Sequence, residues 1–454
     1  MPFKLTNEFI EELKKTLDLK DTDQAYKLVK ELHPADLAEI LGEFTDEEAT
    51  FLYLLLDREM AADVLIEMEE DEREHLLNSL STEDIANHIM ENIESDDAAD
   101  MLMELPEAKK DEVLKKISDI EQAGDIADLL GYDEDSAGGL MAKELIKVNE
   151  NLNVDKSLKE IKKQAEEVDE FYYVYVVDND NVLKGVISLK KLLISRANTK
   201  VRTIVNSDII SVRTDTSSEE VASIMQKYDL VSLPVIDQIG RLVGRITIDD
   251  VVDVIKEEAE KDYQMISGIT EDVEPADNAF VHFRARIPWL LIGLFGGMLD
   301  TQVINLFGES IRINPSIVLF FPMIAAMGGN VGVQASSIVV QGIAANAIDL
   351  QSTGRKLLKE LSIALLNGTI LSSLIFVYNI FFSDSLLLSM TVSLALMAVI
   401  LFASVFGTFV PLALNRFKID PALATGPFIT TVNDIMGIFI YLGIGRIVFS
   451  LFLV

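Results

Sequence analysis

The sequence of 454 residues contains no cysteine, one tryptophan and four histidines. Without cysteine the chain can form neither disulfides nor thiolate metal sites, and little remains to favour zinc or copper. Basic residues are also scarce, with 39 Lys and Arg against 74 Asp and Glu, which gives a net charge of −35. Such a field repels nucleic acid and anionic lipid and concentrates cations. A generic acidic, solubilising surface has the same composition, so charge alone does not establish a cation-binding function.

The charged and apolar residues are separated along the chain. Residues 287–454 hold equal numbers of acidic and basic side chains, so the whole negative excess lies on residues 1–286. This distribution predicts a soluble acidic part followed by a membrane part, with about two to four domains in all. The first residues, MPFKLTNEFIEELKK, lack the apolar core of a signal peptide, so we expect them to remain in the cytoplasm.

Residues 1–131 predict an acidic, all-α N-domain. Apolar residues recur three and four positions apart, as at Leu37, Ile40 and Leu41. Units of about a dozen residues follow one another, such as HPADLAEILGEF, TDEEATFLYLLLD and SDDAADMLMELP, and each has a Pro, Ser, Thr or Asp suited to a helix start. Short stacked helices of this kind predict a superhelical array.

An internal repeat follows within residues 132–248. The segment YYVYVVDNDNVLKGVISLKKLL (172–193) aligns with VSLPVIDQIGRLVGRITIDDVV (231–252), which places Gly185 over Gly244. Each copy predicts a strand, a tight turn, a second strand and a helix, with another helix before it. The pattern resembles a tandem pair of CBS domains, which are α+β ligand-sensing modules.

The CBS resemblance has a consequence for nucleotide binding. In CBS pairs that bind adenine nucleotides, a Thr or Ser and an Asp three residues later contact ribose and phosphate. Thr247 and Asp250 match this pattern, whereas the first copy has Ser188 but Lys191. The resemblance therefore implies at most one site, for a ligand such as ATP. A local role, in which Asp250 caps the helix, is the alternative.

Residues 249–283 predict a long acidic helix and a connector, which would either transmit movement to the membrane or serve as a spacer. Residues 284–454 contain five apolar runs, each long enough to span a bilayer, at about 287–307, 315–348, 357–382, 386–414 and 421–454. Basic residues lie before the first run and in alternate loops: Arg284, Arg286, Arg355, Lys356, Lys359, Arg416 and Lys418. The positive-inside rule predicts a multi-pass protein of the cytoplasmic membrane with its N-terminus in the cytoplasm and its C-terminus outside.

The last apolar run contains one ionisable side chain between Asp420 and Arg446, which is Asp434. A carboxylate at bilayer depth costs about 2.5–3.5 kcal/mol on insertion scales and usually faces a bundle interior or an aqueous path. We expect Asp434 to face a pore and attract a hydrated divalent cation. A hydrogen bond to a neighbouring helix is the alternative.

The second run contains the glycine-rich segment PMIAAMGGNVGVQASS (322–337). Each glycine weakens a helix by roughly 1 kcal/mol relative to alanine, so backbone carbonyls could be freed here to face Asp434. Asn330 and Gln334 add side-chain oxygens, and Thr430 and Thr431 lie about one turn from Asp434. The alternative is close helix packing through Gly328 and Gly332, with Asn330 and Gln334 bonding between helices.

The predicted ligands are all oxygen donors, which indicates a hard cation. Mg²⁺ keeps several waters when one or two carboxylates hold it, whereas a dehydrating Ca²⁺ site would need more carboxylates. Asp300 and Glu360 are further acids within apolar runs. Because Glu360 adjoins Lys359, we expect a local ion pair there.

The whole chain resembles the MgtE family of magnesium channels and transporters. The resemblance rests on the acidic helical N-domain, SAGGLM, the CBS pair, the linking helix, five membrane runs, GGNVGVQ and DPALATGPFITTVND. It implies a homodimer in which Asp434 binds hydrated Mg²⁺ in the pore, with Asn330 and Thr430 nearby. It also implies a cytosolic sensor in which Mg²⁺ bridges acidic residues and holds the pore shut.

Eight acids match the sensing pattern of that family. They are Asp96, Asp97 and Asp100 in the N-domain, and Glu219, Asp229, Asp250, Asp253 and Asp262 in the CBS pair and linking helix. Lys261 stands where the family often has an acid, so one bridging site is expected to be weaker. Divalent ions would also screen the self-repulsion of the acidic part, so compaction and pore closure can be coupled.

Two other functions stay open from the sequence. The same pore could carry another oxygen-ligated divalent cation, such as Co²⁺ or Ni²⁺. The chain could instead be a membrane-anchored CBS nucleotide sensor without transport. No nucleophile–base pair, phosphate loop or metal-hydrolase motif points to an enzyme.

Overall fold

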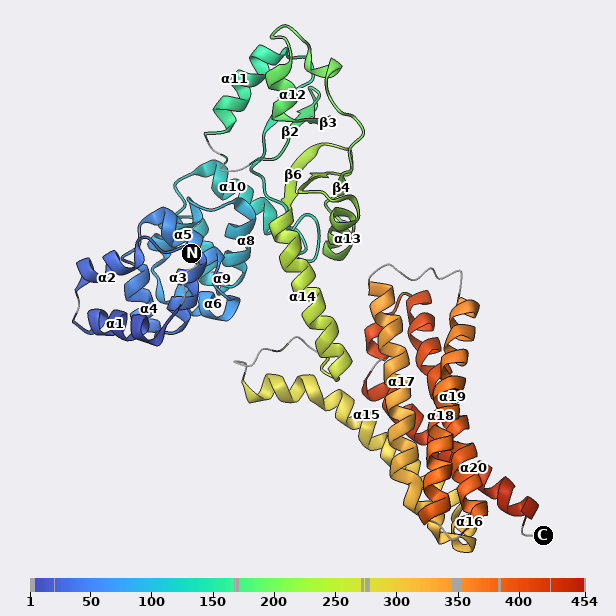
Figure 1. Cartoon of the computed structure of the whole chain (residues 1–454). Helices are drawn as coiled ribbons and strands as arrows, with labels where there is room; N and C mark the ends of the chain where they lie inside the picture. The colour runs from blue at the N-terminus through green and yellow to red at the C-terminus, as the bar shows by residue number, and fades with distance from the viewer. Residues whose placement is uncertain are drawn as a thin grey trace. The chain divides into compact units, whose positions relative to one another are not determined.

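The computed structural model describes residues 5–19, 21–166, 168, 171–270, 273, 278–344, 353–382, 385–424 and 426–452. Contacts between residues divide the chain into two compact units, Met1–Lys256 and Glu257–Val454. Figure 1 shows the elements of each unit. The predicted connector before the membrane part includes residues 271–272 and 274–277, which lie outside the described residues.

The first part of the first unit is helical throughout. Its elements are α1 (Asn7–Asp18), α2 (Thr22–Val29), α3 (Pro34–Gly42), α4 (Asp46–Tyr53), α5 (Arg58–Ile66), α6 (Glu70–Ser79), α7 (Thr82–Asp84), the π-helical turn η1 (Ile85–Met90), α8 (Ser95–Met103), α9 (Glu107–Leu114) and α10 (Ile120–Leu129).

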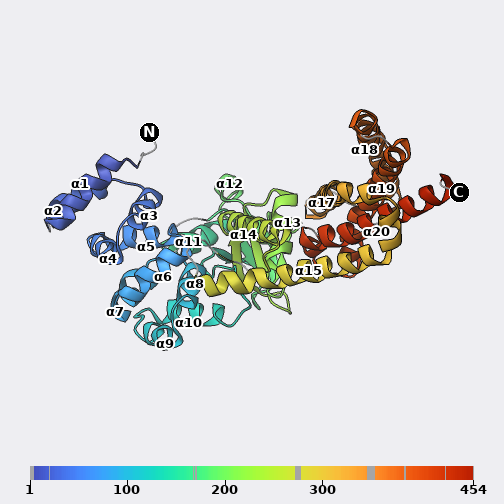
Figure 2. The same ribbon diagram turned by 90° about the horizontal axis from the view of Figure 1, so that it is seen from below.

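Hydrogen bonds at the helix ends explain where several of these helices begin. The Asp57 and Ser81 side chains accept hydrogen bonds from backbone N–H groups in the first turns of α5 and α7, and Thr45 forms a capping box with Glu48. Each helix packs on near neighbours in the sequence, as α3 does on α4 and α5, and α8 on α10. Figure 2 shows the helices following one another from α1 and α2 to α9 and α10, as expected of a superhelical array.

The internal repeat forms two similar three-stranded sheets, ordered β1-β2-β3 and β4-β5-β6. The first copy contains β1 (Lys147–Asn149), α11 (Val154–Gln164), β2 (Val174–Val177), β3 (Leu183–Ile187) and α12 (Leu189–Ile194). After the 3-10 turn η2 (Val201–Thr203), the second copy contains β4 (Val212–Arg213), α13 (Ser218–Tyr228), β5 (Ser232–Ile236) and β6 (Leu242–Thr247).

The strand pairing confirms the repeat at the level of register. Gly185 pairs with Val176, and Gly244 pairs with Val235, and the register of each hairpin shifts directly after that pair. The two copies contact each other through their hairpins, since the Leu183 N–H donates to the Gly240 carbonyl at 3.0 Å. The predicted tandem CBS architecture is therefore present.

Helix α14 (Ile248–Ser267) follows β6 directly and has residues in both units. Its first residues pack with the N-domain and the second repeat, where Val251 and Val254 are buried. Its last turn, in the second unit, meets the start of the final helix. A side chain added at Gly268 would touch Pro427, and one added at Gly426 would overlap the Ile266 carbonyl.

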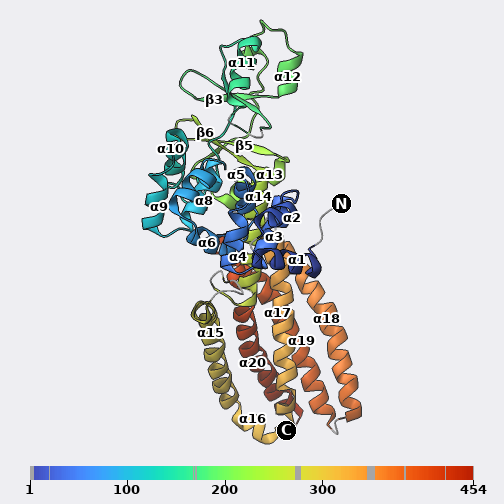
Figure 3. The same cartoon turned by 90° about the vertical axis from the view of Figure 1, so that its left-hand side faces the viewer.

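The second unit is built from long apolar helices. It contains α15 (Ala279–Leu306), α16 (Gly308–Ile313), the 3-10 turn η3 (Pro315–Phe320), α17 (Phe321–Ala344), α18 (Thr353–Phe382), α19 (Leu386–Arg416), the 3-10 turn η5 (Pro421–Ala424) and α20 (Pro427–Phe452). Within the described residues, five helices are long and apolar enough to cross a membrane, which confirms the predicted number. Figure 3 shows α17, α18, α19 and α20 running beside one another, and α15 packs against α20.

Helix α19 forms the centre of this bundle, and glycines allow its neighbours to approach it closely. Val392, Val399 and Ile400 of α19 are fully buried. A Cβ atom at Gly407 would overlap the Gly332 carbonyl of α17, and one at Gly332 would overlap the Asn433 amide of α20. These contacts let backbones meet where larger side chains would separate them, as is usual for helix packing in membranes.

We expect Gly407→Ala to destabilise the membrane bundle by about 1–3 kcal/mol, because the added methyl group must displace the α17 backbone. The matched control is Gly443→Ala, since an added Cβ there meets nothing within 4 Å. The measurement is the melting temperature of the detergent-purified chain, followed by the loss of the monodisperse peak in size-exclusion chromatography. Equal melting temperatures for the two variants would contradict the packing argument.

Candidate cation sites

The predicted pore residues lie together in the second unit. Asp434 and Thr430 of α20 line a cavity of about 300 Å³ with Asn330 and Gln334 of α17. The Asn330 and Gln334 side chains are exposed, while Asp434 is partly buried. A Cβ at Gly329 would lie 3.7 Å from Asp434 Oδ1, so the glycine leaves the carboxylate room beside α17. The site thus combines one carboxylate with amide and hydroxyl oxygens.

The expectation that the glycine-rich segment breaks its helix is wrong, because α17 is continuous from Phe321 to Ala344. The backbone carbonyls of this segment therefore remain within a helix and are not freed as ligands. The packing alternative holds for Gly332, which meets Asn433 and Gly407. Asn330 and Gln334 line the cavity, and the alternative that they bond between helices is not tested.

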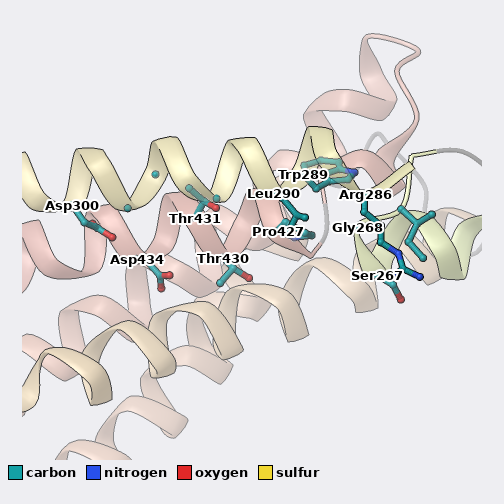
Figure 4. Close-up of a pocket in the computed structure, with 14 residues that line it drawn as sticks. Ser267, Gly268, Arg286, Trp289, Leu290, Asp300, Pro427, Thr430, Thr431 and Asp434 are labelled. Carbon is teal, nitrogen blue, oxygen red and sulfur yellow. The ribbon is translucent and has the colours of Figure 1, made fainter. Parts of the chain in front are cut away.

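A larger cavity of about 780 Å³ is lined by residues of α15 and α20 and by residues 267–269 at the end of α14. Asp434 and Thr430 belong to the lining of both cavities. Figure 4 shows Asp300 on α15, with Asp434, Thr430 and Thr431 on α20, around this space. Arg286 and Trp289 line it near the beginning of α15. The sequence had indicated Asp300 only as a further acid within an apolar run.

Glu360 has a different partner from the one expected. Its Oε1 accepts a hydrogen bond from Ser404 Oγ of α19 at 2.5 Å. Glu360 and Lys359 form no ion pair in the described part of the chain, so the expected local ion pair is wrong. The acid joins α18 to the central helix α19 and lies outside the linings of both cavities.

A dense acidic cluster lies in the first unit, around the start of α8. We call it the acidic cluster and define it as Glu94, Asp96, Asp97, Asp100, Glu144 and Asp250. Carboxylate oxygens of Glu94, Asp96 and Glu144 all lie within 4.8 Å of one another. Asp96 is only 7% exposed, and Arg245 contacts Glu94 Oε1 at 2.5 Å. The separation would suit three carboxylates around a divalent cation.

Burial and mutual repulsion shift the pKa values of this cluster upward. Burial raises the pKa of Glu94 to about 7, although Arg245 opposes the shift. Burial, with the Asp250 charge next in effect, raises the pKa of Asp97 to about 7. The pKa of Asp250 is raised to about 6 by burial, against hydrogen bonds from Thr247. Near neutral pH, protons and a cation would therefore compete for these carboxylates.

Thr247 and Asp250, which are predicted to contact a nucleotide, form hydrogen bonds with each other. Asp250 Oδ2 accepts hydrogen bonds from the Thr247 N–H at 3.0 Å and from Thr247 Oγ1 at 2.7 Å. This is the capping arrangement at the strand-to-helix junction that the sequence left as the alternative. Contact of these residues with a nucleotide stays a prediction.

The remaining predicted sensor residues are spread over other elements. Glu219 lies in the first turn of α13, and Asp229 ends that helix with a positive φ of 52°. Asp253 is exposed on α14. Asp262 lies further along α14 in the second unit, where burial first and then the Asp420 charge raise its pKa. Their role as ligands stays a prediction.

Three acids near these positions were not predicted from the sequence as cation ligands. Glu94 and Glu144 belong to the acidic cluster, and Asp420 faces Asp262 closely enough to affect its titration. Glu94 comes two residues before Asp96, so proximity in sequence was a usable signal for it. Glu144 and Asp420 are brought to their partners by the fold.

Comparison with known proteins agrees with this architecture. The MgtE family model, described as a divalent cation transporter, matches residues 321–444. The model of the MgtE intracellular N domain matches residues 32–135, and CBS domain models match residues 137–197 and 201–257. A magnesium transporter MgtE from Thermus thermophilus is 33% identical over 438 residues, which cover 96% of this chain and 97% of the relative. The chain belongs to the MgtE family.

Further relatives support the assignment to the MgtE family. A magnesium transporter MgtE from Bacillus subtilis is 31% identical over 316 residues, which cover 70% of each chain. The crystal structure of the cytosolic domain of the Mg²⁺ channel MgtE in complex with ATP aligns with 35% identity and a TM-score of 0.51. It covers 54% of this chain and 99% of that domain. The MgtE family comprises transporters, and this member is a multi-pass membrane protein.

We expect the first unit to lose stability as the pH rises from about 4 to 7 in the absence of divalent cations. The direction of this pH effect follows from the coupling between proton binding and folding. Folding raises the pKa values of Glu94, Asp97 and Asp250, so the folded chain binds more protons than the unfolded chain in this window. That contribution is complete at low pH and is lost once the pH passes the folded pKa values. Millimolar Mg²⁺ should therefore stabilise the unit more at pH 8 than at pH 5.5.

The measurement is the temperature at which protease begins to cut within residues 1–256 of the full-length chain in detergent. Asp97→Asn should reduce both the pH dependence and the Mg²⁺ effect. The matched control is Asp111→Asn, which removes an exposed acid of α9 outside the acidic cluster. If the temperature at which protease begins to cut rises between pH 5.5 and 8 without Mg²⁺, the pKa shifts of the acidic cluster do not control the stability of this unit.

Proposed function

We propose that this protein carries hydrated Mg²⁺ across the cytoplasmic membrane along a path that includes Asp434. The observation that carries the proposal is the cavity lined by Asp434, Thr430, Asn330 and Gln334 on two membrane helices. It is supported by relatives named magnesium transporter that match 96% and 70% of the chain. Such a site has only to bind a cation and release it, so the proposed transport requires no enzymatic chemistry.

The composition of the pore site favours Mg²⁺ that keeps its water shell. One carboxylate supplies the charge, while the Asn330, Gln334 and Thr430 oxygens can accept hydrogen bonds from coordinated water. Mg²⁺ loses water reluctantly and is commonly held in this indirect way. Conduction also requires a site that binds the ion weakly enough to release it. A site with one carboxylate per chain meets this requirement. Co²⁺ and Ni²⁺ share the oxygen chemistry and remain competing substrates in the test below.

We further propose a homodimer with the pore between its subunits. The exposed Asn330 and Gln334 side chains lie on α17, so polar amides would face lipid if that face were uncovered. A second copy would cover the face and place two Asp434 carboxylates around one path. The proposed orientation puts residues 1–256 and both ends of α14 on the cytoplasmic side and the C-terminus outside, following the basic loop residues.

Gating by cytosolic Mg²⁺ completes the proposal. Asp250 at the start of α14 belongs to the acidic cluster, in which burial first and then like charges raise the pKa values of Asp97 and Glu94. The end of α14 packs against the first residues of α20, the helix that carries Asp434. A cation that neutralises the cluster would therefore favour one position of α14, and α14 would bias α20. A shift from 1:99 to 99:1 open to closed requires about 5.5 kcal/mol in total, which several sites can share.

ATP is proposed as a second ligand of the CBS pair, because the related cytosolic domain was crystallised in complex with ATP. Thr247 and Asp250 are the residues of this chain that match the nucleotide pattern. Since Asp250 also belongs to the acidic cluster, nucleotide and Mg²⁺ would act on the same end of α14.

We expect Asp434→Asn to reduce Mg²⁺ influx into proteoliposomes by at least about tenfold, because the amide keeps the shape and removes the charge. The measurement uses a Mg²⁺-sensitive dye inside vesicles that contain the full-length chain, and the same assay with Co²⁺ and Ni²⁺ compares the three cations. The control is Glu309→Gln, which removes an exposed acid of α16 outside both cavity linings. Influx in Asp434→Asn equal to that of the control would refute the role of Asp434.

We expect the double variant Asp97→Asn, Asp250→Asn to remain active when the cytosolic side contains millimolar Mg²⁺. Loss of two cluster carboxylates should weaken the closed state, so influx at high cytosolic Mg²⁺ should exceed that of wild type by about tenfold, or ~1.4 kcal/mol. At low cytosolic Mg²⁺ the two proteins should transport at similar rates. Asp111→Asn is again the control, and inhibition as strong as in wild type would exclude the acidic cluster as the sensor.

A further inference from the structure

The larger of the two described cavities offers a second acidic residue that the proposed function has not used. It lies between α15 and α20 and measures about 780 Å³. Six waters occupy about 180 Å³ at the density of the liquid, so a hydrated cation fits with room to spare. The cavity contains Asp300 as well as Asp434 (Figure 4).

Asp300 is the only acid of α15 and lies within its apolar part. Its Oδ1 atom is shielded from solvent and accepts no hydrogen bond from the described residues. Arg286 is the one basic side chain among the described residues that line the cavity, and it precedes Asp300 by about 21 Å of helix rise. The described part of the protein therefore supplies no cation beside this carboxylate.

Asp300 and Asp434 line the same cavity from facing helices, α15 and α20. Two carboxylates that share a cavity without a basic partner are both destabilised in their charged forms. A hydrated divalent cation between them would reduce the repulsion between the two carboxylates. Its coordinated water would also donate a hydrogen bond to Asp300 Oδ1, which has no partner among the described residues. The cavity thus has both the space and the charge for such an ion.

The neighbouring residues suit a water-coated ion. Gly293 and Gly297 of α15 line the cavity, and a Cβ atom at either would meet nothing within 4 Å. Their missing side chains keep this side of the cavity open. Thr430 Oγ1 donates its proton to the Gly426 carbonyl at 2.9 Å, which leaves its lone pairs available to accept from a coordinated water.

We propose that Asp300 is a second cation-binding residue, which holds a hydrated divalent cation in the α15–α20 cavity before or after the cation reaches Asp434. This inference rests on the proposed transport function and extends it to a second site. Asp434 and Thr430 line both cavities, so in this proposal a cation moving from one to the other would stay beside the same carboxylate. Two successive positions would let an arriving ion promote departure of the one ahead.

The first test compares Mg²⁺ influx in proteoliposomes for Asp300→Asn, Asp300→Glu and the matched control Glu309→Gln. Asp300→Asn should raise the Mg²⁺ concentration for half-maximal influx by about tenfold, because the second attraction is lost. Asp300→Glu should lie nearer to wild type, and the control should differ from wild type by less than about twofold. Equal half-maximal concentrations for Asp300→Asn and Glu309→Gln overturn the inference.

The second test does not depend on transport and uses the absence of native cysteine. A single cysteine introduced as Gly297→Cys should react with a cationic methanethiosulfonate reagent, and Mg²⁺ should slow that reaction several-fold. The protection should disappear when Asp300→Asn is added. Gly308→Cys, outside the cavity lining, is the control whose reaction Mg²⁺ should leave unchanged.

The two tests separate this inference from the transport function. If wild type transports Mg²⁺ and Asp434→Asn does not, but Gly297→Cys is unprotected by Mg²⁺, the second site is wrong and transport stands. If wild type transports no Mg²⁺, the proposed function fails, and protection at Gly297→Cys alone decides whether the cavity binds the cation. Failure of Gly297→Cys to react in folded protein also overturns the inference, because the cavity would then be closed to water.

Discussion

Both units of this protein hold carboxylates partly away from water with few basic partners. This arrangement constrains the structure of each unit. In the membrane unit Asp434 and Asp300 share a cavity whose described lining contains one arginine, near the beginning of α15. In the soluble unit the acidic cluster has Arg245 as a close basic partner at Glu94, and burial still raises the pKa of that glutamate to about 7. Each arrangement is unfavourable as a bare set of charges. Both arrangements place like charges together and partly away from water.

Glycines determine how closely the helices around α20 pack. Gly332 and Gly407 bring α17 and α19 into backbone contact, and Gly332 also accommodates Asn433 of α20. The tight contact holds this side of α20 in place, while a Cβ atom at Gly297, which lines the larger cavity, would meet nothing within 4 Å. Asp434 therefore projects from a firmly packed helix into cavities that can hold water. A loosened backbone is not needed to expose oxygen ligands.

The sequence predicted those features that depend on one residue standing out from its surroundings. Asp434 was found because it is a charge in an apolar run, and the CBS pair because Gly185 and Gly244 recur in equivalent positions. The continuity of α17 could not be predicted, because glycines in a helix fit either a break or a close contact. The contact partners Gly407 and Asn433 lie far along the chain and carry no signal of their own. Likewise, Glu144 and Asp420 are two acids among 74 Asp and Glu, and only the fold singles them out.

Acids are more densely grouped in the acidic cluster of the first unit than around the cavities of the second, which would suit the two proposed roles. A path must release the cation, so a few carboxylates with neutral oxygens and room for water are sufficient, and a closer cage would hold the ion too long. A sensor must instead change its own structure when the cation binds. In the proposed sensor, burial and then the charges of neighbouring acids raise the pKa values of Asp96 and Asp97, with Asp250 acting on both, so these acids would repel when no cation is bound. Asp250 lies in the first turn of α14, and Gly268, just after the end of α14, lies beside Pro427, so under the proposed gating α14 would carry relief of that repulsion toward α20.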